Sequence, residues 1–386
     1  MNSFELTSNK YWLILILFII AYFSMYFSFS SEGTNDGGVH RSLYIIMISI
    51  CISLFLLQPK LLDKTIKSIS LVALFGIIIA IYNVFITMHS ESFFINIVLG
   101  IVISSFLVTF VQSNKKISAL AFKTFILINV IALLYQYINN VILGSSQYLH
   151  GDLFSFSRQY YSLNELGFNR VSGYQMEPGS YSTLITLTVL NLYFIEKRTS
   201  IWIYLGLFSC ILTLSAISIF LCLIALFIIN RKFINSSSGK IKIILLLIFS
   251  YSLLESSGFT SYLHERFSSN SMDYSALYKI SNINAIISRD IFDLITGKGL
   301  SWIEPYCYNC GHLTGNGGGI YILSGIGIIG IFLYLSIYLV SKDKLLASLI
   351  ILLLFISRFS VEYPLFWFFI LNAIHSNFHI GTNEEK

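Results

Sequence analysis

Charged residues are scarce in this chain, and their scarcity excludes an ordinary soluble protein. Asp, Glu, Lys and Arg make up 11% of its 386 residues, whereas soluble domains carry about a quarter. Hydrophobic residues make up 55% and occur in apolar blocks separated by short charged stretches. Such blocks are typical of helices that cross a hydrocarbon layer about 30 Å thick, so the sequence predicts an integral membrane protein.

A basic patch, internal repeats and heptads are also lacking. The net charge is +5, but the Lys and Arg residues lie at the ends of apolar blocks, which argues against a nucleic-acid partner. There is no low-complexity linker beyond the short tract from Asn235 to Gly239. We therefore expect residues 1–386 to form a single membrane domain.

The apolar blocks predict an all-α bundle that crosses the membrane about twelve times. The first block lacks a convincing cleavage site and is interpreted as an uncleaved span. Two predictions are strained, because 201–230 is short for two spans and 345–358 is below the ~20 residues of a straight span; either would then be a re-entrant hairpin. The expected spans are 11–29, 43–58, 69–88, 93–111, 118–138, 179–195, 201–215, 216–230, 241–256, 318–340, 345–358 and 361–379.

Basic residues predict which way the bundle faces. Membrane proteins carry more Lys and Arg on the cytoplasmic side, and here the basic pairs 115–116, 197–198 and 231–232 all fall between spans on one side. That side also receives both chain ends, so we expect the N- and C-termini to be cytoplasmic. The two large hydrophilic segments, 139–178 and 256–317, then lie outside.

The second outer segment contains a stretch with one apolar and one polar face. Asn282, Arg289 and Asp293 share the polar face, and Gly297 and Gly299 end the stretch. We expect one amphipathic helix that lies along the membrane surface with its polar side toward water or a cavity. The apolar face holds Ile280, Ile283, Ile287, Ile291 and Leu294.

The first outer segment ends in a motif with two charges. Arg170 and Glu177 are seven residues apart, and Gly173 and Pro178 shape the backbone around them, so the two charges would converge on a pocket at the membrane surface. Alternatively, Arg170 reaches lipid headgroups and Glu177 lies at the start of a helix, where its charge is favoured. The spacing is compatible with both interpretations.

Other polar residues have a functional and a plain interpretation. Arg289 and Asp293, four residues apart, would form an exposed ion pair of about 0.3–0.5 kcal/mol. His312, followed by Asn316, is either a general base beside a membrane cavity or a solvated loop residue. Arg358 lies at one end of a short outer turn. Among the polar residues near the last spans, it is the one that most suggests a functional role.

Cys307 and Cys310 form a metal half-site, a redox pair or a local disulfide. A zinc site needs two more ligands, and the only nearby histidine is His312, so no metal is expected. On an oxidising outer face, the disulfide is the favoured interpretation.

Taken together, these features resemble the bacterial O-antigen polymerases of the Wzy type, within the wider group of membrane polysaccharide polymerases and O-antigen ligases. Family members carry Arg-x-x-Gly followed by an aromatic residue and Glu-Pro before a span. Here Arg170, Gly173, Tyr174 and Glu177-Pro178 match that motif.

Three other segments are similar to the family. Residues 213–218 resemble the Ser/Thr-bearing segment of the family. Residues 289–299 resemble its arginine ahead of a Gly-x-Gly turn, and residues 325–330 resemble its Gly-rich span. The chain departs from the family where a His-Asn dipeptide often precedes that span, because here His312 and Asn316 are separated. The departure bears on which residue acts as the base.

The resemblance implies a glycosyl transfer, without a metal or another cofactor, at the periplasmic face of a bacterial inner membrane. The glycan on one undecaprenyl diphosphate would move onto a second lipid-linked unit, among membrane lipids and beside a flippase and a chain-length regulator of the same pathway. Arg170 and Arg289 would bind the diphosphate, and Glu177 or His312 would be the catalytic base. Further substrate contacts would come from Tyr174, Asn316 and Arg358.

Two alternatives remain open at the level of the sequence. An O-antigen ligase uses the same donor but transfers finished glycan to a lipid A core sugar. A lipid-linked oligosaccharide flippase or transporter would carry out no chemistry. Transporters tend to show internal repeats and charges at mid-membrane, whereas this chain has neither repeat nor such charges and concentrates its polar residues outside.

Overall fold

The computed structural model describes residues 8–30, 37–58, 91–145, 147–153, 171–213, 215–234, 274–299, 317–340, 343–357, 361 and 363–378. Within these ranges the chain forms helices and turns and contains no strand. Three helices are long and apolar enough to cross a membrane, and six shorter apolar helices accompany them. The prediction of an all-helical membrane protein is confirmed in this coarse form; twelve spans stay a prediction, since 69–88 and 241–256 lie outside the described residues.

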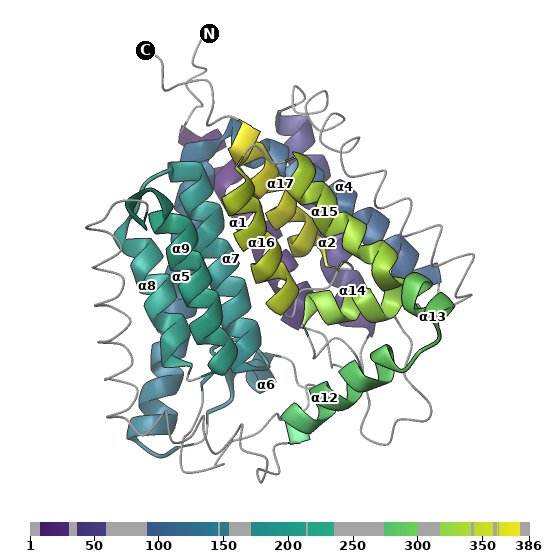
Figure 1. Ribbon diagram of the computed structural model, residues 1–386. Coiled ribbons are helices and arrows are strands. Elements are labelled where there is room, and N and C mark those ends of the chain that lie inside the picture. Colours follow the sequence, from purple (N-terminus) through teal and green to yellow (C-terminus); the bar gives the residue numbers. More distant parts are fainter. Residues whose placement is uncertain are drawn as a thin grey trace.

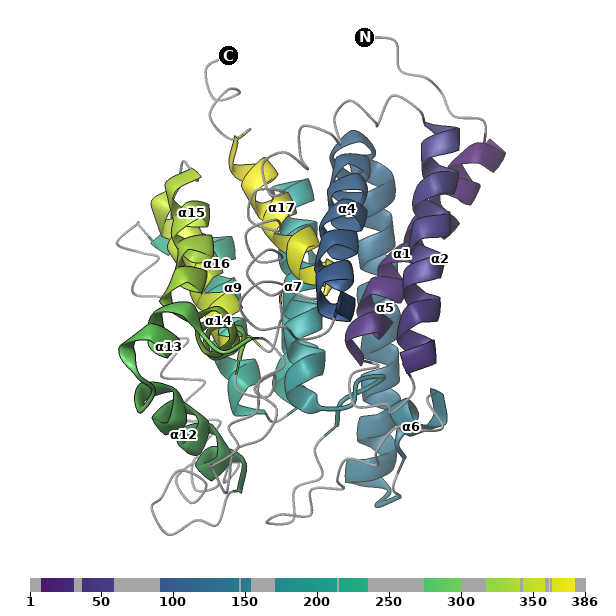
Figure 2. The same cartoon turned by 90° about the vertical axis from the view of Figure 1, so that its right-hand side faces the viewer.

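Seven helices follow the predicted spans to within three residues at each end, except that α2 begins six residues before its predicted span. The first of them starts, and the last of them ends, at the same end of the bundle (Figures 1 and 2). A chain that crosses a membrane an even number of times has its first helix start and its last helix end on the same side. These helices are α1 (Ser8–Ser30), α2 (Gly37–Leu57), α4 (Glu91–Ser113), α5 (Lys115–Tyr137), α7 (Pro178–Glu196), α16 (Lys344–Ile356) and α17 (Pro364–Phe378).

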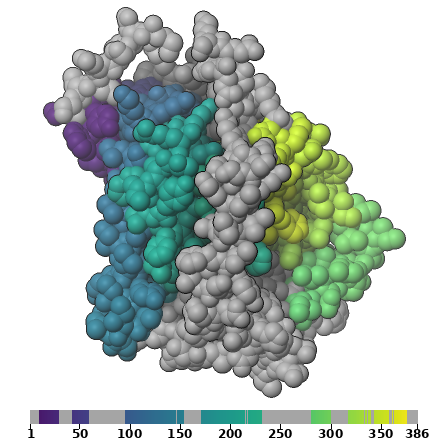
Figure 3. Space-filling model, turned by 60° about the vertical axis from the view of Figure 1, so that its left-hand side comes forward, coloured from purple at the N-terminus to yellow at the C-terminus, as the bar shows by residue number. Residues whose placement is uncertain are grey.

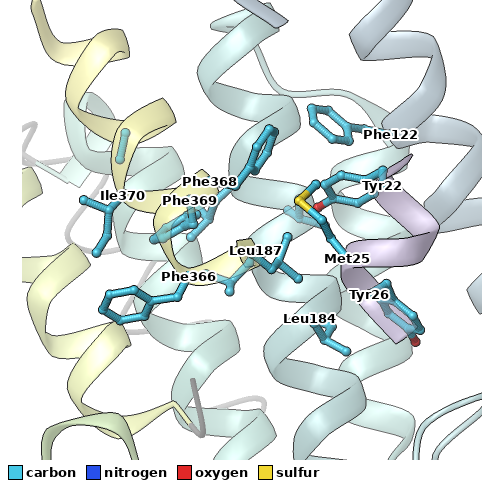
Figure 4. Packing of buried hydrophobic residues seen from close by; sticks show 14 of the residues in the cluster. Tyr22, Met25, Tyr26, Phe122, Leu184, Leu187, Phe366, Phe368, Phe369 and Ile370 are labelled. Atoms are coloured by element: carbon cyan, nitrogen blue, oxygen red, sulfur yellow. The ribbon is translucent and has the colours of Figure 1, made fainter. Parts of the chain in front are cut away.

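The centre of the bundle is helix α7, which buries 16 of its 19 residues. It packs against α5, α17 and the two helices that follow it. Beside it, rings from three other helices meet, including Tyr22, Phe122 and Phe368 (Figure 4). The Tyr22 hydroxyl lies 2.9 Å from Oγ1 of Thr188, so this polar group has a partner inside the apolar core.

Residues 201–234 form two antiparallel helices, α8 (Ile201–Leu212) and α9 (Ala216–Ile234). The predicted division of this segment is confirmed, although α8 rises only about 18 Å at 1.5 Å per residue. The Cys222 thiol donates to the carbonyl of Leu207, which joins the two helices side by side. Both contribute to the teal surface in Figure 3 and expose large apolar side chains, as expected where lipid surrounds a protein.

The predicted span 318–340 is not one helix, and this expectation is wrong. The chain forms α14 (Gly318–Ile326), the 3-10 turn η4 (Gly327–Gly330) and α15 (Ile331–Val340), and α14 and α15 run in different directions (Figures 1 and 2). The cause is Gly327, whose φ of 70° is a left-handed conformation that interrupts a helix. At its N-terminus α14 contacts the end of α16, where the amide of Gly318 donates to the carbonyl of Ser357.

The amphipathic stretch of the second outer segment is also divided, into α12 (Tyr274–Ile287) and α13 (Ile291–Thr296). The expectation of one continuous helix is wrong because Asp290 starts a new one. Its carboxylate accepts a hydrogen bond of 2.8 Å from the amide of Asp293, as an N-cap residue does. The first outer segment is partly helical too, since α5 continues through the π-helical turn η1 (Ile138–Ile142) and is followed by α6 (Leu149–Leu153).

Glycines make the contact between α13 and the broken span. A Cβ on Gly297 would lie 2.5 Å from the backbone of Gly325, and a Cβ on Gly327 would lie 2.3 Å from the carbonyl oxygen of Ile295. Real Cβ atoms do not approach backbone this closely, so the two segments meet as they do only because both positions lack a side chain.

Substitution of Gly297 tests this contact, and Gly144 provides a matched control. The two glycines have similar positive φ values, 72° and 67°, but a Cβ on Gly144 meets nothing within 4 Å. Gly144→Ala should therefore cost only the backbone term of about 1–2 kcal/mol. Gly297→Ala should cost about 1–3 kcal/mol or more in addition, because the added Cβ would overpack the contact with Gly325 and because the ψ of 177° at Gly297 is strained for residues other than glycine. Thermal unfolding of the purified variants in detergent measures both; equal losses would contradict the close approach.

Candidate functional site

The structure describes three of the residues predicted to form the site: Tyr174, Glu177 and Arg289. The catalytic and binding roles proposed for the others fall on positions outside the described residues. The predicted residues outside the described ranges are Arg170, Cys307, Cys310, His312, Asn316 and Arg358.

The backbone that follows Arg170 is held on helix α5 by a single side chain. The Oε1 atom of Gln136 accepts hydrogen bonds of 2.8 Å from the amides of both Ser172 and Gly173. Its Nε2 atom donates to the carbonyl of Gln147, so it also fixes the segment after α5. Gln136 is buried, and sequence reasoning missed it; the only signal is an amide side chain near the end of an apolar block.

Glu177 is the residue that immediately precedes α7. Its backbone is extended, Pro178 occupies the first helical position, and its carbonyl accepts the amide of Tyr181 at 3.1 Å. Its side chain does not cap the helix, and the residue is half-buried. The sequence-based alternative, a carboxylate at the start of a helix, therefore describes its place correctly.

One helical turn further into the bundle, three buried hydroxyl groups meet. Ser182 Oγ lies 3.2 Å from Thr213 Oγ1 and 2.5 Å from Ser218 Oγ, and the last two are 2.8 Å apart. Ser182 also donates to the carbonyl of Pro178. The turn between α8 and α9, which includes the buried Ser215, is thereby attached to the start of α7. The sequence pointed to residues 213–218 but missed Ser182, their partner.

Arg289 lies in the turn between α12 and α13, where it caps the end of a membrane helix. Its Nη1 donates to the carbonyl of Ser324 at 2.7 Å, and its Nη2 donates to the hydroxyl of the same residue at 2.9 Å. The amide of Lys298 donates to this carbonyl as well, and the amide of Gly299 donates to that of Gly325. The last carbonyls of α14, which have no partner within the helix, are satisfied in this way.

The ion pair predicted between Arg289 and Asp293 is not the one that forms. Asp293 Oδ2 lies 2.8 Å from Lys298 Nζ, five residues further along the chain. The prediction failed because it assumed one continuous helix, in which residues four apart are neighbours. The break at Asp290 removes that relation and leaves Arg289 to face Ser324.

The apolar side of α12 and α13 points away from the protein. The exposed fraction is 68% for Ile287, 77% for Ile291 and 70% for Phe292, whereas Ile286 is only 3% exposed. A surface helix with exposed apolar residues is typical of one that lies in the membrane interface. Of the predicted polar face, Asn282 is buried and Arg289 and Asp293 are partly buried, whereas Asn284 and Asp290 are exposed. That the stretch lies along a membrane surface stays a prediction.

The start of α7 and the helices α12 to α14 lie toward the same end of the bundle (Figures 1 and 2). The structure thus brings the segments of Glu177 and Arg289, 112 positions apart in the sequence, to one face of the molecule. That their side chains converge on one pocket stays a prediction. No group of three or more His, Cys, Asp or Glu side chains suited to a metal ion occurs among the described residues.

No protein-family model, no curated protein and no solved structure matches this chain. Its function is therefore argued from its own residues and geometry.

Removal of the Gln136 side chain tests how the motif after Arg170 is held. Gln136→Leu leaves two buried amides without their acceptor, at about 1–3 kcal/mol each. We expect a marked fall in the thermal unfolding midpoint in detergent. Asn139→Leu serves as the control, since Asn139 Nδ2 donates only to the carbonyl of Tyr135 in its own helix. A Gln136→Leu protein as stable as Asn139→Leu would show that Gln136 does not anchor the motif.

Proposed function

We propose that this protein is a membrane glycosyltransferase that polymerises undecaprenyl-diphosphate-linked repeat units into O-antigen or a related surface polysaccharide. The reaction would take place at the periplasmic face of a bacterial inner membrane. The observation that carries the proposal is the place of Arg289. This cation is hydrogen-bonded to Ser324 at the end of α14, where a membrane helix is interrupted, and it lies between the interfacial helices α12 and α13. Its segment lies toward the same end of the bundle as the segment of Glu177 (Figures 1 and 2).

A guanidinium group suits the leaving group of this reaction. It is planar, always charged, and pairs with phosphate oxygens through two parallel hydrogen bonds. Ser324 takes up two of the N–H groups of Arg289 and thereby fixes the plane of the guanidinium. A charge held in place before the substrate arrives stabilises developing negative charge with little reorganisation. Arg170 would supply a second guanidinium to the diphosphate.

The other requirement is a base for the acceptor. A hydroxyl of the acceptor sugar attacks the anomeric carbon of the donor glycan, the bond from that carbon to the diphosphate oxygen breaks, and the hydroxyl proton passes to a carboxylate or imidazole. Undecaprenyl diphosphate leaves with the bonding electrons. Glu177 is the favoured base, since it is half-buried at the start of α7, and His312 is the alternative.

A second candidate function has one observation in its favour. Interrupted membrane helices such as α14–η4–α15 are typical of secondary transporters, where the break lies at the substrate site. This keeps a lipid-linked oligosaccharide flippase as the alternative from another class. An O-antigen ligase remains the alternative within the same class.

Deletion of the gene distinguishes the three functions. Loss of a polymerase should leave a lipid A core that carries a single repeat unit, as seen on a gel of the surface polysaccharide. Loss of a ligase should leave bare core while lipid-linked polymer accumulates, and loss of a flippase should leave no exported repeat unit. A normal polymer ladder in the deletion strain would rule out the polymerase.

Arginine variants test the proposed site in the complemented deletion strain. Arg170→Ala and Arg289→Ala should each reduce polymer by about a hundredfold or more, the usual effect of removing a group that stabilises transition-state charge. Lys298→Ala is the control, because it removes a positive charge from the same segment but one that is paired with Asp293. Each variant is compared at equal amounts of membrane-inserted protein. Full-length polymer from an arginine variant would remove that residue from the mechanism.

A further inference from the structure

Helix α12 contains a buried amide that lacks hydrogen bonds. Asn282 is only 1% exposed, and neither its Oδ1 nor its Nδ2 has a hydrogen-bond partner among the described residues. Buried side-chain amides are nearly always paired, because an unpaired one loses its bonds to water and gains none in return. An exception of this kind calls for a physical reason.

The direction in which Asn282 points follows from the exposure of its neighbours. Ile280 is 55% exposed and Ile287 is 68% exposed, whereas Ile286, one helical turn after Asn282, is buried. Three isoleucines of α12, Ile280, Ile283 and Ile287, therefore face outward, whereas Asn282 lies on the buried side together with Ile286. Arg289 follows seven positions after Asn282, in the turn that joins α12 to α13.

The side chains of Asn282 and Arg289 recognise different chemical groups. A guanidinium pairs with phosphate oxygens, whereas a neutral amide offers two N–H donors and a carbonyl acceptor. Adjacent hydroxyls of a sugar ring, each both donor and acceptor, complement such an amide. An amide reserved for a ligand is unpaired before the ligand binds and is satisfied by it, and it discriminates strongly against ligands that lack the hydroxyl.

We propose that Asn282 binds hydroxyl groups of the sugar adjacent to the diphosphate of the lipid-linked glycan, while Arg289 holds the diphosphate. This inference rests on the proposed function and adds to it a residue that recognises the sugar. Asn282 is thus a substrate-binding residue on the inner side of an interfacial helix whose outer side lies in lipid.

Substitution by leucine separates this role from a structural one. Leucine has the same number and branching of side-chain heavy atoms as asparagine but no polar atom, so Asn282→Leu removes an unpaired amide and should leave the thermal unfolding midpoint in detergent unchanged or raise it. Asn284→Leu is the matched control on the same helix, since Asn284 is exposed. A clear fall in the midpoint of Asn282→Leu alone would show that the amide is needed for the fold and would overturn the proposal.

Binding is measured with two probes, as the increase in unfolding midpoint over a range of lipid concentrations. One probe is undecaprenyl diphosphate without sugar, and the other is the lipid-linked oligosaccharide extracted from the deletion strain. The wild type and Asn284→Leu should bind the sugar-bearing lipid more tightly. Asn282→Leu should bind it about tenfold more weakly than the wild type, the effect of two neutral hydrogen bonds, and should bind undecaprenyl diphosphate unchanged.

The outcomes distinguish this inference from the function on which it rests. If Asn282→Leu binds the sugar-bearing lipid as tightly as the wild type does, the role of Asn282 is overturned while the proposed function stands. If Asn282→Leu loses affinity for both lipids equally, the assignment to the sugar is overturned. If neither lipid stabilises the wild type, the proposed function fails and the inference fails with it.

Discussion

A chain that crosses a membrane has to pair the backbone groups of every interrupted helix within the protein, because hydrocarbon offers no partner. The interruption between α14 and α15 meets this constraint with groups from the second outer segment. Arg289 donates to the carbonyl and hydroxyl of Ser324, and the amides of Lys298 and Gly299 donate to the last carbonyls of α14. The contact that makes the break tolerable therefore also attaches α12 and α13 to the bundle.

This attachment links the plain and the functional interpretations of Arg289. A cap on a helix end is a structural role, and a guanidinium fixed by two hydrogen bonds is at the same time a preorganised cation for a phosphate group. The close approach of Gly297 to Gly325 sets how near the cap and the helix lie. The proposed site thus depends on glycines that contact no substrate.

The other half of the proposed site is built on α7, which buries 16 of its 19 residues. Gln136 holds the backbone that leads into α7, and the hydroxyls of Ser182, Thr213 and Ser218 attach the α8–α9 turn to the first turn of α7. Small hydroxyl and amide side chains suit this task, because they allow close helix packing and bond across it. Glu177 therefore sits at the end of a firmly packed element, which is what a base in a defined position requires.

The sequence by itself determined that the protein is helical and membrane-embedded, which segments are apolar, and that the stretch after Ile280 has one apolar face, because composition and periodicity are local properties. It also singled out Glu177 and Arg289 by their type and setting. Only the tertiary structure decided that α12 ends before Arg289, that Gly327 separates α14 from α15, and that Asn282 is buried with no hydrogen-bond partner in the part of the chain that the structure describes. The tertiary structure also pairs Arg289 with Ser324, 35 positions apart, which no local pattern predicts. No local pattern specifies which distant carbonyl needs a donor, so these features become visible only once the helices are packed together.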